Sequence, residues 1–147
     1  PLTKNKTKII ESDYVVNEKE NLVISLDQIK KNILSKSFNV IDARSLERFE
    51  GKVSEPRKGL RSGHIQNSFC LPFNQCINQK TGEFKNLEEL RELFNQNENI
   101  EKRLDQVFTC GSGVTAAVLA YAYKMVNNDY IPKIYDGSWS EYGKYPA

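Results

Sequence analysis

The sequence is poor in the residues that build disulfide frameworks and metal centres. Its 147 residues include three cysteines and a single histidine, His64. An odd number of cysteines without a C-x-x-C pair is not typical of a disulfide framework, and the spacing of these residues offers no set of zinc ligands. We therefore expect no bound metal and an intracellular, reducing compartment.

Charge of one sign and long apolar runs are also scarce. The chain has 21 basic and 19 acidic residues, a formal net charge of +2 at pH 7, and so small a surplus does not favour nucleic acid or an anionic membrane as the main partner. The longest apolar runs are only a few residues, whereas a helix needs about 20 to cross a bilayer. Residues 1–14 lack the apolar core of a signal peptide. We expect no nucleic-acid partner and no membrane partner.

Short apolar runs and helical patterns alternate along most of the chain. Residues 1–21 are polar and are predicted to be a linker or lead-in, whereas residues 22–147 have the size of one ordinary domain. The predicted strands are 38–44, 68–73, 106–110 and 133–137, and the predicted helices are 26–35, 45–51, 86–96, 114–126 and 138–143. This alternation favours an α/β fold whose mostly parallel sheet is covered by helices on both faces.

Three of these helices carry apolar residues at helical spacing, which predicts the faces that pack against the sheet. The first helix also begins with a capping-box pattern formed by Ser25 and Gln28. The predicted apolar faces are Leu26, Ile29, Ile33 and Leu34 in helix 26–35, Leu87, Leu90 and Phe94 in helix 86–96, and Val114, Val118, Tyr121, Ala122 and Met125 in helix 114–126.

The stretch TCGSGVTA places Cys110 between a predicted strand and a predicted helix. In parallel α/β folds, ligands bind beyond the carboxyl ends of the strands, and Cys110 lies at such an end. Gly111 and Gly113 allow the backbone to curl around the sulfur so that amides point inward, and the following helix adds the positive end of its dipole. Both effects favour a thiolate, so we expect Cys110 to be a nucleophile with a lowered pKa.

Other interpretations of this loop are weaker. A buried structural cysteine is common and suits Cys70 and Cys76, but a structural thiol does not require the glycine-rich loop that follows Cys110. The loop does not match the phosphate-binding pattern G-x-x-x-x-G-K-[ST]. A phosphatase of the Cys-x5-Arg type would need an arginine where Ala116 stands.

Four motifs, in order along the chain, resemble the rhodanese sulfurtransferases, in particular the catalytic half of the 3-mercaptopyruvate members. They are VIDARSLERFEG (40–51), SEPRKGLRSGHI (54–65), CGSGVTA (110–116) and IYDGSWSEYG (134–143). The resemblance implies a rhodanese-like three-layer α/β fold and no cofactor. It also implies an N-terminal rhodanese domain as a partner, because the cysteine-bearing domain is usually the second of a tandem pair.

The resemblance further implies a reaction. Cys110 would take sulfane sulfur from 3-mercaptopyruvate as a persulfide, release pyruvate, and pass the sulfur to cyanide or to a thiol such as thioredoxin or a low-molecular-weight thiol. The loop 111–113 is uncharged, which favours mercaptopyruvate and leaves thiosulfate as a slower donor. The cytoplasm and the mitochondrial matrix both suit such an enzyme.

Residue roles follow from the same resemblance. Arg48 and Arg57 would bind the carboxylate and ketone of the donor, in keeping with the bidentate grip of guanidinium groups on carboxylates. Ser112 would either relay a proton or bond the loop backbone, and the sequence does not choose between these roles. The catalytic set is Cys110 and Ser112, and the substrate-binding set is Arg48, Arg57, Gly111, Gly113, Val114 and Thr115.

Several other polar and aromatic residues are expected to have structural roles. We expect His64 to belong to a turn, Asp42 and Asp136 to brace loops, and Trp139 and Tyr142 to pack in the core. Two departures from the family pattern stand beside them. Ser54 and the pair Gln66-Asn67 replace a proline and a Pro-Gly pair, and asparagine tolerates the positive φ of such a turn. The alternatives to an enzyme are a partner-dependent binding module and a persulfide carrier between proteins.

Overall fold

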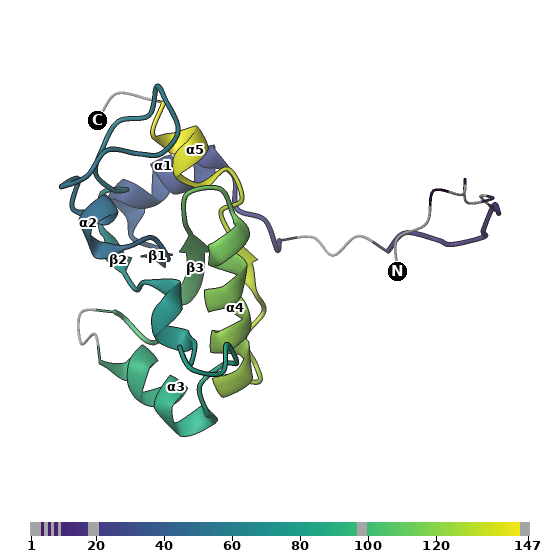
Figure 1. The fold of residues 1–147 in the computed structure, drawn as a ribbon. Helices are drawn as coiled ribbons and strands as arrows, with labels where there is room; N and C mark the ends of the chain where they lie inside the picture. The colour runs from purple at the N-terminus through teal and green to yellow at the C-terminus, as the bar shows by residue number, and fades with distance from the viewer. Residues whose placement is uncertain are drawn as a thin grey trace.

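The structure is a computed structural model that describes residues 4, 6, 8, 10–17, 21–96 and 100–144. Within these residues, four strands form one sheet in the order β2-β1-β3-β4 (Figure 1). The strands are β1 (Phe38–Asp42), β2 (Ser68–Cys70), β3 (Asp105–Thr109) and β4 (Lys133–Ile134). Every neighbouring pair is parallel, which confirms the predicted parallel sheet.

The helices lie between and around these strands. They are α1 (Leu26–Ser35), α2 (Leu46–Phe49), α3 (Leu87–Asn95), α4 (Val114–Val126) and α5 (Ser138–Tyr142), together with the 3-10 turn η1 (Phe73–Cys76). All five predicted helices are present close to their expected bounds, whereas η1 had no signal in the sequence. In the described part of the chain, no helix is both long enough and apolar enough to cross a membrane.

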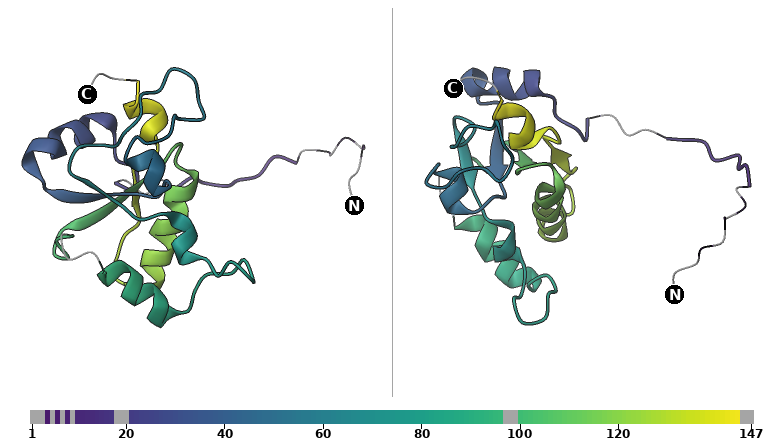
Figure 2. Two further views of the ribbon diagram at one scale, coloured as in Figure 1. Left: turned by 60° about the vertical axis from the view of Figure 1, so that its left-hand side comes forward. Right: turned by 45° about the horizontal axis from the view of Figure 1, so that its top comes forward.

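Apolar layers cover both faces of the sheet. Ile41 and Phe108 belong to a core cluster formed with α3 and α4, whereas their neighbours Val40 and Val107 belong to a second cluster formed with α1 and α5. Successive side chains of a strand point to opposite faces, so this offset of one residue places a helical layer on each side (Figure 2). The predicted three-layer α/β fold is confirmed.

The predicted apolar face of α4 is wrong in part. Val114 and Tyr121 are 73% and 59% exposed, although both were expected to pack against the sheet. The buried residues of this helix are Ala116, Leu119, Ala120 and Ala122. Almost every position of α4 is apolar, so two different stripes satisfy helical spacing and the pattern alone does not choose between them.

The ends of α1 and α3 show smaller departures. Leu34 is 89% exposed and Leu87 is 42% exposed, because they lie at the end of α1 and the start of α3, while Leu93 is buried instead. The predicted capping box of α1 is present. The Gln28 amide donates to Ser25 Oγ at 3.3 Å, and the Ser25 amide donates to Gln28 Oε1 at 2.8 Å.

The loops that carry the candidate site residues meet at the carboxyl edge of the sheet. The last residues of β1 and β3, Asp42 and Thr109, are register partners. The long loop 52–63 lies beside α5 (Figure 1), where the amide of Arg61 donates to the carbonyl of Gly143 at 3.1 Å. This edge therefore joins segments that are far apart in the sequence.

Candidate active site

Cys110 follows β3 directly and stands at the carboxyl edge of the sheet. Its residue is only 2% exposed, and the backbone amide of Ser112 donates to its Sγ at 3.4 Å. The loop passes through Gly113, which has a φ of 85°, and enters α4 at Val114. The sulfur is therefore enclosed by its own loop and the first turn of the following helix, as the sequence predicted.

The surroundings of the sulfur favour its ionised form. Burial raises the pKa of the Cys110 thiol and is the largest single effect, but the opposing hydrogen bonds outweigh it together. These bonds come from the Thr115 hydroxyl and from the backbone amides of Ser112, Ala116 and Thr115. The pKa of Cys110 is therefore lowered, in the predicted direction, because donors that face a thiolate stabilise its charge.

The other two cysteines show the opposite behaviour. Burial raises the pKa of Cys70 to about 12, with the nearby Asp42 charge adding to the effect. Burial likewise raises the pKa of Cys76 to about 11. All three cysteines are free thiols, so Cys110 alone combines a free thiol with an environment that charges it.

Residues 110–113 form the cysteine loop, and helix α5 holds the side of this loop opposite the sulfur. The amide of Trp139 donates to the carbonyl of Cys110, and the amide of Ser140 donates to the carbonyl of Gly111, both at 2.9 Å. The first turn of a helix has backbone amides without partners inside the helix, and here two of them satisfy the loop. The loop carbonyls are thereby directed toward α5.

Ser138 adds a side-chain contact that the sequence analysis did not identify. Its hydroxyl accepts the amide of Cys110 at 3.2 Å and the amide of Gly113 at 3.0 Å. It also donates to the carbonyl of Tyr135 at 2.8 Å. The only sequence signal for this residue was its place in the IYDGSWSEYG motif, which gave it no role.

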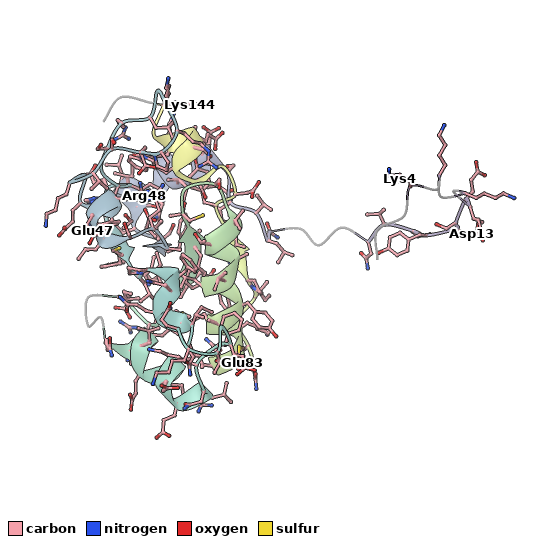
Figure 3. The ribbon with its side chains drawn as sticks, viewed as in Figure 1. Lys4, Asp13, Glu47, Arg48, Glu83 and Lys144 are labelled. Carbon is pink, nitrogen blue, oxygen red and sulfur yellow. The ribbon has the colours of Figure 1, made fainter. Side chains whose placement is uncertain are left out.

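The two predicted arginines meet at the cysteine loop although they come from different segments. Arg48 belongs to α2 (Figure 3), and Arg57 belongs to the loop 52–63. A methyl group placed on Gly111 would lie 3.0 Å from Arg48 Nη2 and 3.7 Å from Arg57 Nη1. The structure thus brings both guanidinium groups to the residue that follows Cys110.

A buried ion network supports one of these arginines. Arg44 pairs with Asp42 at 2.7 Å and with Glu55 at 2.8 Å, and all three side chains are about 1% exposed. The other oxygen of Glu55 contacts Arg48 Nη2 at 2.5 Å. The network agrees with the bracing role expected for Asp42. Neither Arg44 nor Glu55 was among the site residues predicted from the sequence, although Arg44 stands two residues beyond the end of a strand.

The positive charge of Arg57 is not balanced in the same way. Among the residues that the structure describes, Asp42 and Glu55 offset Arg44 and Arg48, whereas no ion pair to Arg57 is found. Its residue is exposed. The site therefore presents one uncompensated guanidinium next to the cysteine loop, which suits a small anionic ligand.

Several residues occupy the structural positions that the sequence indicated. His64 Nδ1 lies 2.8 Å from the carbonyl of Phe49, and the two rings stack at 4.0 Å. The rings of Trp139 and Tyr142 lie 5.7 Å apart in the core. Asn67 adopts a φ of 63°, as its place in the turn requires. These contacts account for His64 without a catalytic role.

The remaining predicted residues lie around the same loop. A methyl group on Gly113 would lie 2.5 Å from Asp136 Oδ1, so the exposed aspartate abuts the loop. Val114 points into solvent, and the contact of Ser112 with the sulfur is made by its amide. In the described ranges, no group of three or more histidine, cysteine, aspartate or glutamate residues is arranged to hold a metal ion.

Comparison with known proteins gives consistent matches. The model of the family "Rhodanese-like domain" matches residues 25–145. A protein of Arabidopsis thaliana named thiosulfate/3-mercaptopyruvate sulfurtransferase 1, mitochondrial, is 43% identical over 86% of this chain and 32% of its own length. Human 3-mercaptopyruvate sulfurtransferase is 35% identical over 97% of this chain and 47% of its own length. The chain therefore spans half or less of these relatives.

A solved structure supports the same assignment. The crystal structure described as the rhodanese fold of a 3-mercaptopyruvate sulfotransferase from Escherichia coli superposes with a TM-score of 0.71 at 28% identity. The match covers 95% of this chain and 50% of that one.

Proposed function

Because this chain belongs to the rhodanese family, we propose that it is the cysteine-bearing domain of a sulfurtransferase that uses 3-mercaptopyruvate. The observation that carries the proposal is the meeting of Arg48 and Arg57 at Gly111, beside a cysteine whose pKa is lowered. A sulfur nucleophile and a cationic grip for a carboxylate are the two elements that such a reaction needs.

The first half of the proposed reaction forms a persulfide. The Cys110 thiolate attacks the sulfur of 3-mercaptopyruvate, and a sulfur–sulfur bond forms while the carbon–sulfur bond breaks. The electron pair of the broken bond goes to the carbon as the enolate of pyruvate, which then takes up a proton. Ser112 is the candidate for relaying that proton, or else it only braces the loop.

The second half returns the cysteine to its starting state. An acceptor thiolate, from thioredoxin or a low-molecular-weight thiol, attacks the outer sulfur and releases Cys110 as a thiolate, and cyanide would leave as thiocyanate. The amides of Ser112 and Ala116 and the Thr115 hydroxyl stabilise this sulfur anion. They therefore make Cys110 a good leaving group as well as a good nucleophile.

The arginines have different roles in this scheme. Arg57, whose charge has no ion pair among the described residues, holds the donor carboxylate, and Arg48 directs a hydrogen bond to the ketone. The uncharged loop 111–113 supports a keto-acid donor over the doubly charged thiosulfate, which we propose as the slower substrate. In this scheme Gly113 and Val114 contribute backbone to the proposed donor site.

The partners and the compartment follow from the relatives and are part of the proposal. One relative bears the word mitochondrial in its name, so the mitochondrial matrix and the cytoplasm are the proposed locations. The relatives extend well beyond the matched region, and we propose that an N-terminal rhodanese domain completes the site.

A donor assay tests the proposal directly. The chain is incubated with 3-mercaptopyruvate and dithiothreitol, and pyruvate and sulfide are quantified. In a parallel incubation without dithiothreitol, which would reduce the persulfide, mass spectrometry detects the gain of one sulfur on Cys110. Wild type should give products and adduct, whereas Cys110→Ser should give neither. Absence of both products and adduct with wild type would overturn the enzyme proposal for this chain. If a cysteine desulfurase still loaded Cys110, the chain would be a persulfide carrier.

A further inference from the structure

Ser138 has an unusual backbone for a serine. It is fully buried, and its φ is 50°, in the left-handed region where glycine is the default residue. The preceding position is already a glycine, Gly137, and it does not use that freedom, since its φ is −53°. A serine in the left-handed position therefore calls for an explanation in its side chain.

The hydroxyl of Ser138 is fully engaged. A serine hydroxyl has one hydrogen to donate and two lone pairs that accept. The hydrogen goes to the carbonyl of Tyr135 at 2.8 Å. The oxygen accepts hydrogen bonds from the amides of Cys110 at 3.2 Å and Gly113 at 3.0 Å, and a longer one from the Thr109 hydroxyl at 3.3 Å. One oxygen atom thus joins the first and last residues of the cysteine loop and anchors them to the end of β4.

The amides between these two anchor points are oriented by the carbonyls that α5 holds. A trans peptide is planar, and its N–H and C=O point in opposite directions. The Ser140 amide draws the carbonyl of Gly111 toward α5, so the N–H of the same peptide, which belongs to Ser112, points away from α5. That N–H lies 3.4 Å from Cys110 Sγ.

We propose that Ser138 is a positioning residue for Cys110, whose hydroxyl takes up the amides at both ends of the loop and so leaves the amides of Ser112, Thr115 and Ala116 to face the sulfur. The proposal rests on the proposed role of Cys110 as the nucleophile, but it concerns how that sulfur is charged and not which donor it meets. Without the hydroxyl, the amides of Cys110 and Gly113 lose a buried acceptor and the loop reorganises to satisfy them.

Alkylation of Cys110 by iodoacetamide measures this effect without any sulfur donor, because only the thiolate reacts. Rate constants are obtained across pH for wild type, Ser138→Ala and Ser138→Gly, with the alkylated peptide identified by mass spectrometry. The matched control is Ser140→Ala, since the Ser140 hydroxyl is in the same helix but bonds the carbonyl of Gly137 and not the loop. Circular dichroism establishes that each variant is folded.

The expected result is a rise of about one unit in the midpoint of the alkylation profile for both Ser138 variants, or roughly tenfold slower alkylation below the midpoint. Ser140→Ala should keep the wild-type profile. Glycine suits the left-handed backbone, so Ser138→Gly removes the hydroxyl without adding strain. If both Ser138 variants kept the wild-type midpoint, even with reduced stability, Ser138 would be a packing residue and the proposal would fail.

A measurement on the wild-type chain covers the case in which the variants do not fold. In an NMR titration of the thiol, the amide proton of Ser112 should shift with the ionisation of Cys110, whereas that of Gly113, bound to the Ser138 hydroxyl, should shift much less. Equal shifts would overturn the proposed division of the amides. A chain that passed these tests but formed no pyruvate would contradict the proposed function alone.

Discussion

The carboxylate of Glu55 bridges Arg48, at the cysteine loop, to Arg44 in the protein interior. One of its oxygens lies 2.5 Å from Arg48 Nη2 and the other lies 2.8 Å from Arg44 Nη1. Arg44 is held in turn by Asp42 at the end of β1, and its guanidinium lies 4.4 Å from the ring of Trp139. The orientation of Arg48 is therefore fixed from the core of the fold.

Replacing Glu55 by glutamine should show how much the support of Arg48 contributes, separately from the chemistry at Cys110. Loss of one partner from a buried ion pair costs roughly 3–5 kcal/mol, and we expect about 3 kcal/mol because Arg44 keeps Asp42. The KM for 3-mercaptopyruvate should rise more than kcat falls, since Arg48 loses its orientation. Urea unfolding and steady-state kinetics measure the two effects.

The control for this prediction is Glu50→Gln. Glu50 forms a solvent-exposed pair with Lys52, and such surface pairs contribute only about 0–1 kcal/mol. Equal destabilisation by the two substitutions would contradict the support role assigned to Glu55.

Replacing Arg57 by alanine should weaken donor binding while sparing the cysteine. Charged hydrogen bonds contribute about 1.5–3 kcal/mol, so kcat/KM for 3-mercaptopyruvate should fall roughly 10- to 100-fold. Persulfide loading of Cys110 by a cysteine desulfurase should change little. Lys58→Ala, an exposed neighbour in the same loop, is the matched control, and an equal loss in both assays would make Arg57 a structural residue.

Sequence patterns located the strands and the proposed nucleophile because both are signalled locally. Cys110 stands within a glycine-rich loop between a strand and a helix, and the resemblance to a known family supplied Arg48 and Arg57. Ser138 and Glu55 were missed because their roles lie in contacts with residues distant in the chain. The Ser138 hydroxyl acts on an amide 28 positions away, and no local pattern reports such a contact.

The prediction of which face of α4 is buried failed for a different reason. Amphipathic spacing is informative only when polar residues mark the opposite face. In VTAAVLAYAYKMV, the polar residues are Thr115 and Lys124 with two tyrosines, and they do not define one side. Packing against β3 selected the stripe that contains Ala116, Ala120 and Ala122 as well as Leu119, because the small alanine side chains allow the helix to approach the sheet closely.

Adding a methyl group at Gly111 should disturb the arginines and not the sulfur. The new carbon would lie 3.0 Å from Arg48 Nη2, which displaces the end of a flexible side chain. We expect Gly111→Ala to raise the KM for 3-mercaptopyruvate about tenfold and to change stability by less than about 1 kcal/mol. The pH profile of Cys110 alkylation should remain that of wild type, and a shifted profile would contradict this separation.

Substitution of Gly113 by alanine should be more disruptive than the same change at Gly59. Both glycines have positive φ, 85° and 81°, but a methyl on Gly59 meets no atom of the described residues within 4 Å, whereas one on Gly113 meets Asp136 at 2.5 Å. Gly59→Ala should cost about 1 kcal/mol for backbone strain, and Gly113→Ala about 1 kcal/mol more because Asp136 must leave its rotamer. Urea unfolding compares them, and equal costs would mean that Asp136 yields freely.

The stability of the fold should decline in alkaline solution. In the unfolded chain a cysteine ionises near pH 8.5, whereas burial raises the pKa of Cys76 to about 11 in the folded chain. A raised folded pKa contributes stability that is complete below the unfolded pKa and is lost as the pH rises toward the folded value. Burial raises the pKa of Cys70 as well. Both thiols therefore lose their contribution to stability over the same pH range, between about pH 8.5 and pH 11.

Unfolding by urea under reducing conditions at several pH values tests this expectation. Each thiol should contribute at most about 1.4 kcal/mol per pH unit, and Cys76→Ala should be less stable at neutral pH but decline less steeply above about pH 8.5. Cys110→Ser is the control. The pKa of Cys110 is lowered in the folded chain, so its ionisation adds stability and does not contribute to the alkaline decline. The Cys110→Ser variant should therefore retain the full decline. A decline that disappeared in Cys110→Ser and persisted unchanged in Cys76→Ala would reverse the assignment of the charged and the buried neutral thiol.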